Sequence, residues 1–262
     1  MEITVRELGK TYASRGGESV VALEDVTTDI HSGEFVSLVG PSGCGKSTLL
    51  DIIAGLIPKT TGEVRFDGVA LGDAVADRRV GLVFQRPVLL PWLTALANVY
   101  LPAEVGVNPA KNTAEEELRP RALELLELVG LEGFTEKYPW ELSGGMQQRV
   151  AIARALLLKA EVMCLDEPFA ALDEFTREQM HLELLKLWRD QGFTAIFVTH
   201  NIFEAAFLSD RVLVMTPRPG RVVADVPIDL PRPRTNEMIG TAGFTENVQR
   251  VRSAMTEHWA MQ

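Results

Sequence analysis

The stretch Gly40-Pro-Ser-Gly-Cys-Gly-Lys-Ser-Thr48 determines how the rest of the chain is interpreted. It matches the pattern G-x-x-x-x-G-K-[ST] of phosphate-binding loops. The apolar run at residues 34–39 predicts a buried strand before it, and residues 47–54 predict a helix that ends near Gly55 and Pro58. Backbone N–H groups of such a loop and the positive end of the helix both attract anions. The stretch therefore predicts a phosphate site on an α/β core.

Each residue of this loop is a candidate contact for a nucleotide. Glycines allow the loop to turn tightly enough for its backbone N–H groups to point at phosphate oxygens. Lys46 is expected to reach the β- and γ-phosphates, and the Ser47 hydroxyl to take one position around Mg²⁺. A glycine-rich turn without function is the alternative, and the strand before it and the helix after it argue against that reading. The candidate contacts are Gly40, Pro41, Ser42, Gly43, Cys44, Gly45, Lys46, Ser47 and Thr48.

Composition excludes several classes of function. The chain has 262 residues, enough for one large domain or one domain with an inserted lobe. Its formal net charge of −10 argues against a nucleic-acid-binding surface, which needs clustered Lys and Arg. Cys44 and Cys164 have no spacing typical of a metal site or a disulfide. With neither a signal-peptide pattern nor a membrane-spanning stretch in the sequence, we expect a cytoplasmic protein.

The first part of the chain alternates between strand patterns and turns. Strands are expected over residues 2–8, 20–26, 63–66 and 80–84, with a turn at 60–62 and another at Asp67-Gly68. Tyr12 is expected in a polar loop over residues 10–19. From residue 86 to about 160 the strand pattern disappears and prolines separate helical pieces, one of them from Thr113 to Val129 with Leu123 and Leu126 on one face.

The pattern of strand and helix resumes after residue 160. Strands are expected over 162–168, 194–199, 211–215 and 221–226, and helices over 174–190 and 201–208. In the longer helix, Phe175, Leu184, Leu185 and Trp188 are candidates for burial. Residues 232–262 form an extension in which 244–255 predict a helix. The sequence thus predicts an α/β domain over residues 1–231 with a helical lobe at about 87–160.

Two further stretches carry chemistry. Leu165-Asp-Glu-Pro168 ends an apolar strand, and ligands of open parallel sheets bind at that end of the strands. Asp166 would face Mg²⁺, and Glu167 is suited to polarise a water for attack on a γ-phosphate. Without the phosphate loop upstream, the two carboxylates would indicate no more than a solvated turn.

Ser143-Gly144-Gly145 marks a second glycine-bearing helix start and therefore a second anion site. The two helix starts are about a hundred residues apart and cannot form one local cradle. One arrangement brings them together across a two-fold dimer, in which each subunit gives its phosphate loop to one nucleotide and its Ser-Gly-Gly to the other. The alternative is an N-cap serine followed by glycines that allow close packing.

Taken together, these motifs resemble the ATP-binding-cassette (ABC) ATPases over residues 1 to about 225. The resemblance rests on Gly40–Thr48, Gln85, Leu142–Arg149, Leu165–Pro168, Ala171–Asp173 and His200, in that order. It implies a P-loop core of mixed, mainly parallel sheet, an antiparallel β subdomain and an inserted helical subdomain. Met146 and Asn201 depart from the residues most common in the family at those positions.

The resemblance also assigns roles. Tyr12 matches the aromatic residue that stacks on adenine, and Gln85 matches the glutamine that contacts Mg²⁺ and the attacking water. Ser143 and Gly145 match the signature that contacts the γ-phosphate in trans. Asp173 matches an aspartate that crosses the dimer contact, and His200 a histidine that hydrogen-bonds the γ-phosphate. Glu167 would be the general base, with Lys46, Mg²⁺ and two helix N-termini supplying positive charge for hydrolysis.

Three longer stretches resemble the ATPase subunits of bacterial nitrate, sulfonate and taurine importers. They are Leu89–Thr94, Asp166–Trp188 and Met215–Arg221. The resemblance implies ATP, Mg²⁺, a second copy of the chain, a membrane permease and, indirectly, a substrate-binding protein as partners. It also implies a peripheral position at the cytoplasmic face of the membrane. In the loop, Leu89, Leu90, Trp92 and Leu93 are a candidate contact for the permease, or alternatively a locally buried core loop.

Two other functions agree less well with the sequence than import does. Soluble ABC ATPases that act on DNA or ribosomes usually carry tandem cassettes, long coiled coils or basic arms, and this chain has one cassette, no heptad run and an acidic balance. A P-loop kinase or GTPase would leave Ser143–Gly145 and His200 without roles. The sequence therefore favours an import ATPase whose cargo is a small anion.

Overall fold

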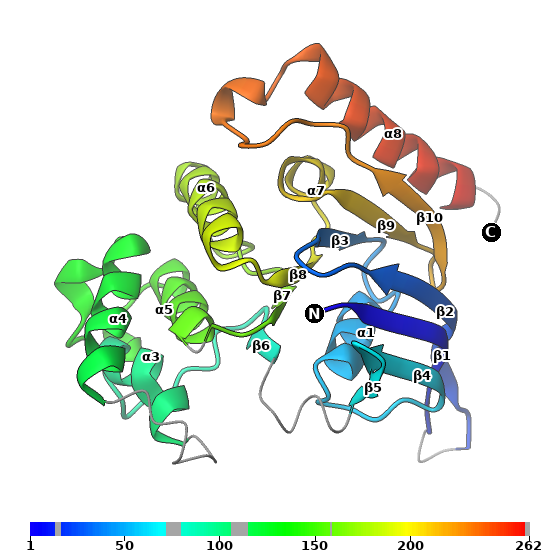
Figure 1. The fold of residues 1–262 in the computed structure, drawn as a ribbon. Coiled ribbons are helices and arrows are strands. Elements are labelled where there is room, and N and C mark those ends of the chain that lie inside the picture. The colour runs from blue at the N-terminus through cyan, green and yellow to red at the C-terminus, as the bar shows by residue number, and fades with distance from the viewer. Residues whose placement is uncertain (14–16, 72–79, 106–114, 158, 260–262) are drawn as a thin grey trace.

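The computed structural model describes residues 1–13, 17–71, 80–105, 115–157 and 159–259. Its strands form a six-stranded sheet in the order β10-β9-β3-β8-β7-β6 and a four-stranded sheet in the order β2-β1-β4-β5 (Figure 1). The strands of the larger sheet are β3 (Phe35–Val39), β6 (Val80–Val83), β7 (Val162–Asp166), β8 (Thr194–Val198), β9 (Arg211–Met215) and β10 (Val222–Pro227). Those of the smaller sheet are β1 (Ile3–Tyr12), β2 (Val20–Ile30), β4 (Thr61–Phe66) and β5 (Val69–Ala70).

The six-stranded sheet is parallel apart from β10, which pairs antiparallel with β9. Side chains alternate between its two faces, as strand geometry requires. Phe35 and Val39 enter one hydrophobic core, while Val36 and Leu38 enter the other. Both faces are therefore covered, which explains why these strands have continuous apolar sequences.

Helices cover each face of this sheet. Helix α1 (Lys46–Ile53) contacts β7 and β8 and buries Leu49, Leu50 and Ile52 in the core shared with the four-stranded sheet. On the other face lie α6 (Glu174–Gln191), α7 (Ile202–Leu208) and α8 (Ala242–Trp259). The parallel strands therefore have the two-sided helical cover expected of α/β proteins.

The four-stranded sheet is antiparallel throughout, and it corrects two expectations. Tyr12 is the last residue of β1 rather than part of a loop, because Thr11 and Tyr12 continue to pair with Val21 and Val20 after register shifts. Strand β4 already begins at Thr61, where the sequence predicts a turn, and Gly62 takes a left-handed conformation (φ 74°) inside it. The Asp67-Gly68 turn predicted between β4 and β5 is confirmed.

A group of helices follows β6 and lies at the far side of the six-stranded sheet from the antiparallel sheet (Figure 1). It consists of α3 (Ala95–Glu104), α4 (Glu115–Leu128) and α5 (Gly144–Leu157), with short 3₁₀ turns η2 (Glu132–Phe134) and η3 (Pro139–Glu141). Among the described residues between 86 and 160 there is no strand. Pro102 and Pro120 lie inside α3 and α4 rather than between helical pieces. In α4 the buried face carries Leu125 and Leu126, whereas Leu123 is exposed, contrary to the expectation.

The C-terminal extension packs on the core. Helix α8 contacts α7, β9 and β10 and buries Phe244, Val248 and Val251. Before it, η4 (Asn236–Met238) follows a segment in which Arg234 is only 5% exposed. The Arg234 guanidinium donates to the carbonyls of Ala206, Phe207 and Ser209 at the end of α7, at 2.9, 2.6 and 2.7 Å. These carbonyls have no partner within the helix, so Arg234 caps α7 from the extension.

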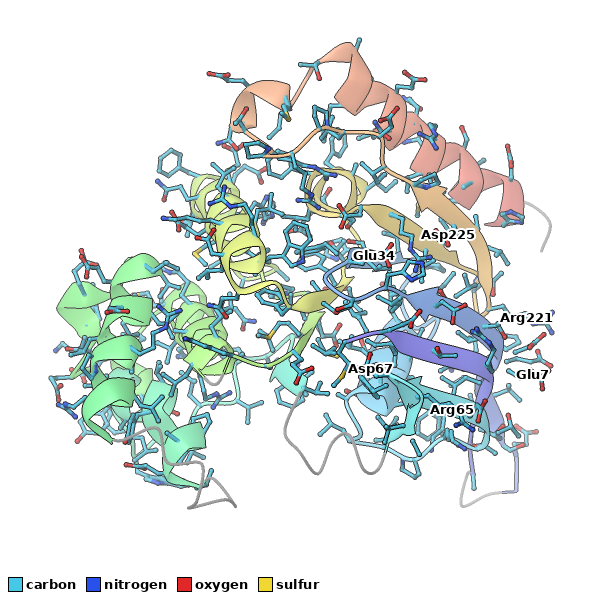
Figure 2. The ribbon with its side chains drawn as sticks, viewed as in Figure 1. Glu7, Glu34, Arg65, Asp67, Arg221 and Asp225 are labelled. Atoms are coloured by element: carbon cyan, nitrogen blue, oxygen red, sulfur yellow. The ribbon has the colours of Figure 1, made fainter. Side chains whose placement is uncertain are left out.

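Arg211 joins the two sheets. Its guanidinium pairs with Glu34 at 2.6 Å, contacts Asp225 of β10 and donates to the carbonyl of Asp29 in β2. Figure 2 labels Glu34 and Asp225, which lie near one another between β3 and β10. Because Arg211 and Glu34 are largely shielded from water and the guanidinium is multiply bonded, the pairing fixes how the antiparallel sheet is attached.

Within the described part of the chain, no helix combines the length and the apolar character that a membrane crossing requires. Cys44 and Cys164 are both buried free thiols. Burial raises the pKa of the Cys164 thiol, so this residue is inert rather than a ligand or nucleophile.

Candidate nucleotide-binding site

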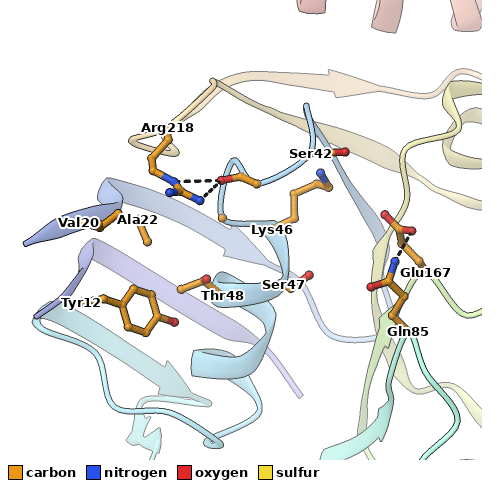
Figure 3. A pocket seen from close by; sticks show the side chains of 12 residues that line it. Tyr12, Val20, Ala22, Ser42, Lys46, Ser47, Thr48, Gln85, Glu167 and Arg218 are labelled. Carbon is orange, nitrogen blue, oxygen red and sulfur yellow. Dashed lines mark hydrogen bonds between the residues drawn. The ribbon is translucent and has the colours of Figure 1, made fainter. Parts of the chain in front are cut away.

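A cavity of about 340 Å³ lies between α1, the ends of β1 and β2, and the strands β6 and β7 (Figure 3). The residues that line it come from separate parts of the sequence. They are Tyr12, Val20, Ala22, Ser42, Gly43, Gly45, Lys46, Ser47, Thr48, Gln85, Glu167 and Arg218. The fold thus brings the predicted aromatic residue, the phosphate loop and two predicted catalytic residues to one place.

The loop Gly40–Thr48 has the conformation that its glycines allow. Gly43 and Gly45 have φ angles of 75° and 107°, in the region that favours glycine. A side chain at Gly45 would also meet the Ala22 carbonyl, 2.9 Å from the position of a Cβ atom. Gly45 is the N-cap of α1, so the backbone N–H groups at the start of that helix face the cavity region.

Lys46 is the buried cation of the site, with 6% of its surface exposed. Its Nζ donates to the carbonyls of Gly40 at 2.8 Å and Pro41 at 3.0 Å. Two carbonyl oxygens are neutral acceptors and do not neutralise the positive charge. An anionic phosphate oxygen would therefore be a stronger acceptor for the same N–H groups.

Asp166 and Glu167 end strand β7 beside this loop. Burial raises the pKa of Asp166; the Ser47 hydroxyl lowers it, and the nearby carboxylates of Glu167 and Asp51 add to the rise. Its Oδ1 is buried without a hydrogen-bond partner. A buried carboxylate oxygen with no donor, next to a hydroxyl, is suited to a hard cation such as Mg²⁺.

The Glu167 carboxylate is held between two other predicted catalytic residues. Gln85 donates from Nε2 to Glu167 Oε2 at 3.0 Å, and His200 Nδ1 lies 3.3 Å from Oε1 (Figure 3 shows the first contact). These residues follow β6, β7 and β8, neighbouring strands whose carboxyl ends meet at one edge. Glu167 itself has a φ of 45°, rare for a residue with a side chain and typical of functional sites.

Behind His200 lies a buried polar network that the sequence did not indicate. His181 of α6 hydrogen-bonds through Nε2 to Glu204 Oε1 of α7 at 2.8 Å, and the second oxygen of Glu204 accepts from the Thr199 hydroxyl. Thr199 Oγ1 in turn accepts from the backbone N–H of Asn201 at 3.0 Å. The residues on both sides of His200 are therefore fixed by side-chain contacts.

The predicted second anion site lies outside the cavity. Ser143 precedes α5 and its Oγ accepts from the N–H of Met146 at 3.3 Å, while Gly144 and Gly145 start the helix. A Cβ atom at Gly145 would lie 3.1 Å from Leu172, so this helix start packs on the loop before Asp173. Ser143, Gly144 and Asp173 are exposed. Within one chain the structure does not bring Ser143–Gly145 or Asp173 to the phosphate loop.

Asp173 has a local structural role besides its predicted one. It is the N-cap of α6, and its carboxylate accepts from the N–H of Thr176 at 3.0 Å. That hydrogen bond is the main cause that lowers the pKa of Asp173, and attraction to Arg149 of α5 contributes. The carboxylate is thus charged and fixed at the surface, beside the start of α5.

Sequence reasoning missed three residues of the cavity, namely Val20, Ala22 and Arg218. Arg218 lies in the stretch Met215–Arg221, for which the sequence shows only a family resemblance and no role in the site. Its Nε and Nη2 donate to the Gly43 carbonyl at 3.3 and 3.1 Å. Glycine and proline around Arg218 were a signal for a turn, but nothing in the sequence indicated that this turn reaches the phosphate loop.

Comparison with known proteins decides the family. The family profile described as "ABC transporter" matches residues 23–170, more than half of the chain. The chain belongs to the ABC transporter family. A taurine import ATP-binding protein of Rhizobium johnstonii is 49% identical over 221 residues, which cover 84% of this chain and 82% of that protein. A bicarbonate transport ATP-binding protein of a Synechocystis strain is 43% identical, covering 90% and 82%.

A solved structure of this family supports the same assignment. It is the dimeric structure of a post-hydrolysis state of an ATP-binding cassette bound to ADP and Pi, with a TM-score of 0.79 and 40% identity. The alignment covers 87% of this ABC ATPase and 99% of that chain. The fold, the family and the ATPase class predicted from the sequence are confirmed.

Proposed function

We propose that this ABC ATPase hydrolyses ATP to drive the import of a small anion through a separate membrane permease. One observation carries the proposal: a carboxylate held by Gln85 and His200 faces a phosphate loop in one cavity. Relatives named for the import of taurine and the transport of bicarbonate support a transport role and disfavour action on DNA or ribosomes. Both cargoes are small and carry an acidic group, which agrees with the nitrate, sulfonate and taurine class.

In this proposal the cavity binds the adenine base of ATP at one end and the phosphates at the other. Tyr12, with 42% of its surface exposed at the cavity, stacks on the adenine base. The N–H groups of Gly40–Thr48 and the Lys46 ammonium bind the phosphates, as their placement at the N-terminus of α1 supports. Ser47, Asp166 and Gln85 are the candidate ligands of Mg²⁺. When bound, this ion would neutralise negative charge on the phosphate oxygens.

Glu167 acts as the general base in hydrolysis. Its carboxylate accepts a proton from the attacking water and thereby orients that water towards the γ-phosphorus. Gln85 and His200, which already contact the two carboxylate oxygens, hold the side chain in its place. His200 and Lys46 then stabilise the charge on the γ-phosphoryl oxygens by hydrogen bonding and attraction.

A second copy of the chain completes the site. Ser143–Gly145 form an exposed helix start that does not reach the cavity of their own chain, so the γ-phosphate they would bind belongs to a partner. Asp173 lies beside this helix start and is placed to cross the same contact. The dimeric state of the related cassette bound to ADP and Pi supports this arrangement.

The permease is proposed to dock on the helical subdomain, assigned to residues of about 87–160. Trp92 has 67% of its surface exposed, and Leu89, Leu90 and Leu93 beside it are only partly buried. An exposed tryptophan in a proline-bounded loop is typical of a protein interface. The ATPase would then lie at the cytoplasmic face of the membrane, with a substrate-binding protein acting on the other side of the permease.

Reconstitution tests this function. The chain is used as bait to purify its permease, and ATP turnover of the assembled complex is measured with taurine, aliphatic sulfonates, nitrate and bicarbonate in turn. We expect stimulation by one of these anions, and its loss with Trp92→Ala but not with Trp140→Ala, which alters an equally exposed tryptophan. Recovery of ribosomes or nucleic acid instead of a permease would contradict the proposal.

A further inference from the structure

Lys10 lies directly against the ring of Tyr12. Its Nζ is 4.9 Å from the ring centroid, within the range of a cation–π contact. The two residues are two positions apart at the end of β1, where the register of its pairing with β2 shifts between Lys10 and Thr11. Lys10 is only 9% exposed and does not line the cavity, whereas Tyr12 is 42% exposed and does. The cation therefore covers the protein side of the ring and leaves the other side to a ligand.

The Lys10 ammonium is itself fixed by the backbone that follows α1. It donates to the carbonyl of Pro58 at 2.6 Å. Two more hydrogen bonds join the same segments, from Thr60 N–H to the Gly9 carbonyl at 2.9 Å and from Thr11 N–H to the Thr60 hydroxyl at 3.0 Å. The end of β1 is thereby tied to residues 58–60.

This connection relates the two ends of the nucleotide site. The N-terminus of α1 carries the phosphate loop, and residues 55–60 continue from its C-terminus back to β1. Helix α1 is short and rigid, so the distance from the phosphate loop to residues 58–60 is fixed. The Tyr12 ring therefore lies at a fixed distance from the phosphate loop. Lys10 is the side chain that connects this ring to residues 58–60.

We propose that Lys10 is a positioning residue for the nucleotide base, acting through Tyr12; this rests on the proposed function of the cavity. Attraction between the ammonium and the ring holds the aromatic side chain in its stacking position before the nucleotide binds. Less ordering is then needed on binding, which raises affinity. Since the contact orders the ring without touching the base, it strengthens binding of adenine and guanine nucleotides alike.

The test measures the binding of Mg-ADP, Mg-GDP and Mg-pyrophosphate to the full chain by titration calorimetry. ADP is chosen because it carries a base and lacks the γ-phosphate on which the proposed dimer depends. Lys10→Met keeps the length of the side chain and removes its charge. We expect it to weaken ADP and GDP binding by about threefold to tenfold, and to leave pyrophosphate binding unchanged.

Two further variants distinguish positioning from general support of the fold. Lys10→Arg retains a cation and should restore ADP affinity, while Lys59→Met removes an exposed charge nearby and should have no effect. In a Tyr12→Leu chain, Lys10→Met should change ADP affinity by less than about twofold, because the two residues then act through one contact.

Three results would overturn the proposal. One is unchanged ADP binding by Lys10→Met, and another is an equal loss of pyrophosphate binding. The third is an undiminished effect of Lys10→Met in the Tyr12→Leu chain. A wild-type chain that bound neither ADP nor pyrophosphate would overturn the proposed function itself, and this inference with it.

Discussion

At the scale of single residues, the cavity contains residues whose backbone conformation or charge is unfavourable in its surroundings. Glu167 has a left-handed backbone (φ 45°), stabilised by a hydrogen bond from its N–H to the Val198 carbonyl at 2.9 Å. Lys46 is a buried cation, and Asp166 is a half-buried carboxylate whose buried Oδ1 has no hydrogen-bond partner. Such features cost stability and persist where the surrounding structure requires them. Substitutions at these residues are therefore expected to affect activity and stability differently.

Glu167→Gln preserves the shape of the side chain and removes its basicity. We expect steady-state ATP turnover to fall by about 10²–10⁴-fold, with ATP still bound. The matched control is Glu174→Gln, which changes an exposed glutamate in the first turn of α6 and should leave turnover near the wild-type rate. Near-normal hydrolysis by Glu167→Gln would remove this residue from the role of general base.

Asp166→Asn should stabilise the nucleotide-free and metal-free protein. Burial raises the pKa of Asp166 in the folded state, so the folded chain keeps this carboxyl protonated up to a higher pH than the unfolded chain does. The charged carboxylate therefore reduces stability above the folded-state pKa, and the cost disappears as pH falls below the unfolded value of about 3.9. Asp166→Asn should melt at a higher temperature than wild type at pH 7, by about 2–4 °C for each kcal/mol of destabilisation that the substitution removes. A lower melting temperature at pH 7, or a difference that grows in acid, would contradict this assignment.

At the scale of elements, the sequence predicted the strands best where both faces are buried. The apolar runs of β3, β7 and β8 are found within one or two residues of their predicted bounds, because a strand buried on both sides must be apolar throughout. The predictions were wrong where packing against another element determines whether a side chain is buried. Phe175 fits the apolar pattern of α6 yet is 70% exposed, since it lies in the first turn beyond the reach of the core.

The connection between the C-terminal extension and α7 provides a prediction at this scale. Burial lowers the pKa of Arg234 to about 9, yet three carbonyls at the end of α7 depend on its guanidinium. Arg234→Met would leave these buried acceptors without donors, at a cost of about 3 kcal/mol. We expect a fall in melting temperature of roughly 6–12 °C. Arg252→Met, on the exposed face of α8, is the control, and equal melting of the two variants would contradict the capping role.

At the scale of the whole molecule, the sequence anticipated which residues carry chemistry better than how they meet. Gly40–Thr48, Gln85 and Glu167 were expected together, and the carboxyl ends of adjacent parallel strands bring them there. Arg218 was not foreseen, because it reaches the phosphate loop through a turn whose direction no local pattern reveals. The Lys10–Tyr12 contact was not foreseen, because residues 10–19 were expected to form a loop and β1 continues to Tyr12. The network behind His200 was not foreseen either, because His181 and Glu204 meet only when α6 and α7 pack together.

The separation of Ser143–Gly145 from the cavity is the feature that gives the molecule its proposed working state. One chain has a phosphate loop with Glu167, the proposed general base, beside it. Its other helix start, Ser143–Gly145, is exposed and lies away from this cavity. Two chains related by a two-fold axis can satisfy both needs at once, with ATP between them. In the proposed dimer, each monomer therefore supplies half of each of two sites.

Light scattering of the Glu167→Gln chain with Mg-ATP tests this claim most directly, because the variant should bind ATP without consuming it. We predict a mass twice the 28.9 kDa of one chain with Mg-ATP, and the single-chain mass with Mg-ADP. Adding Ser143→Arg to this variant should abolish the dimer while ATP binding persists. An ATP-saturated Glu167→Gln chain that stays at 28.9 kDa when alone, and that binds its permease as a single copy, would contradict the account.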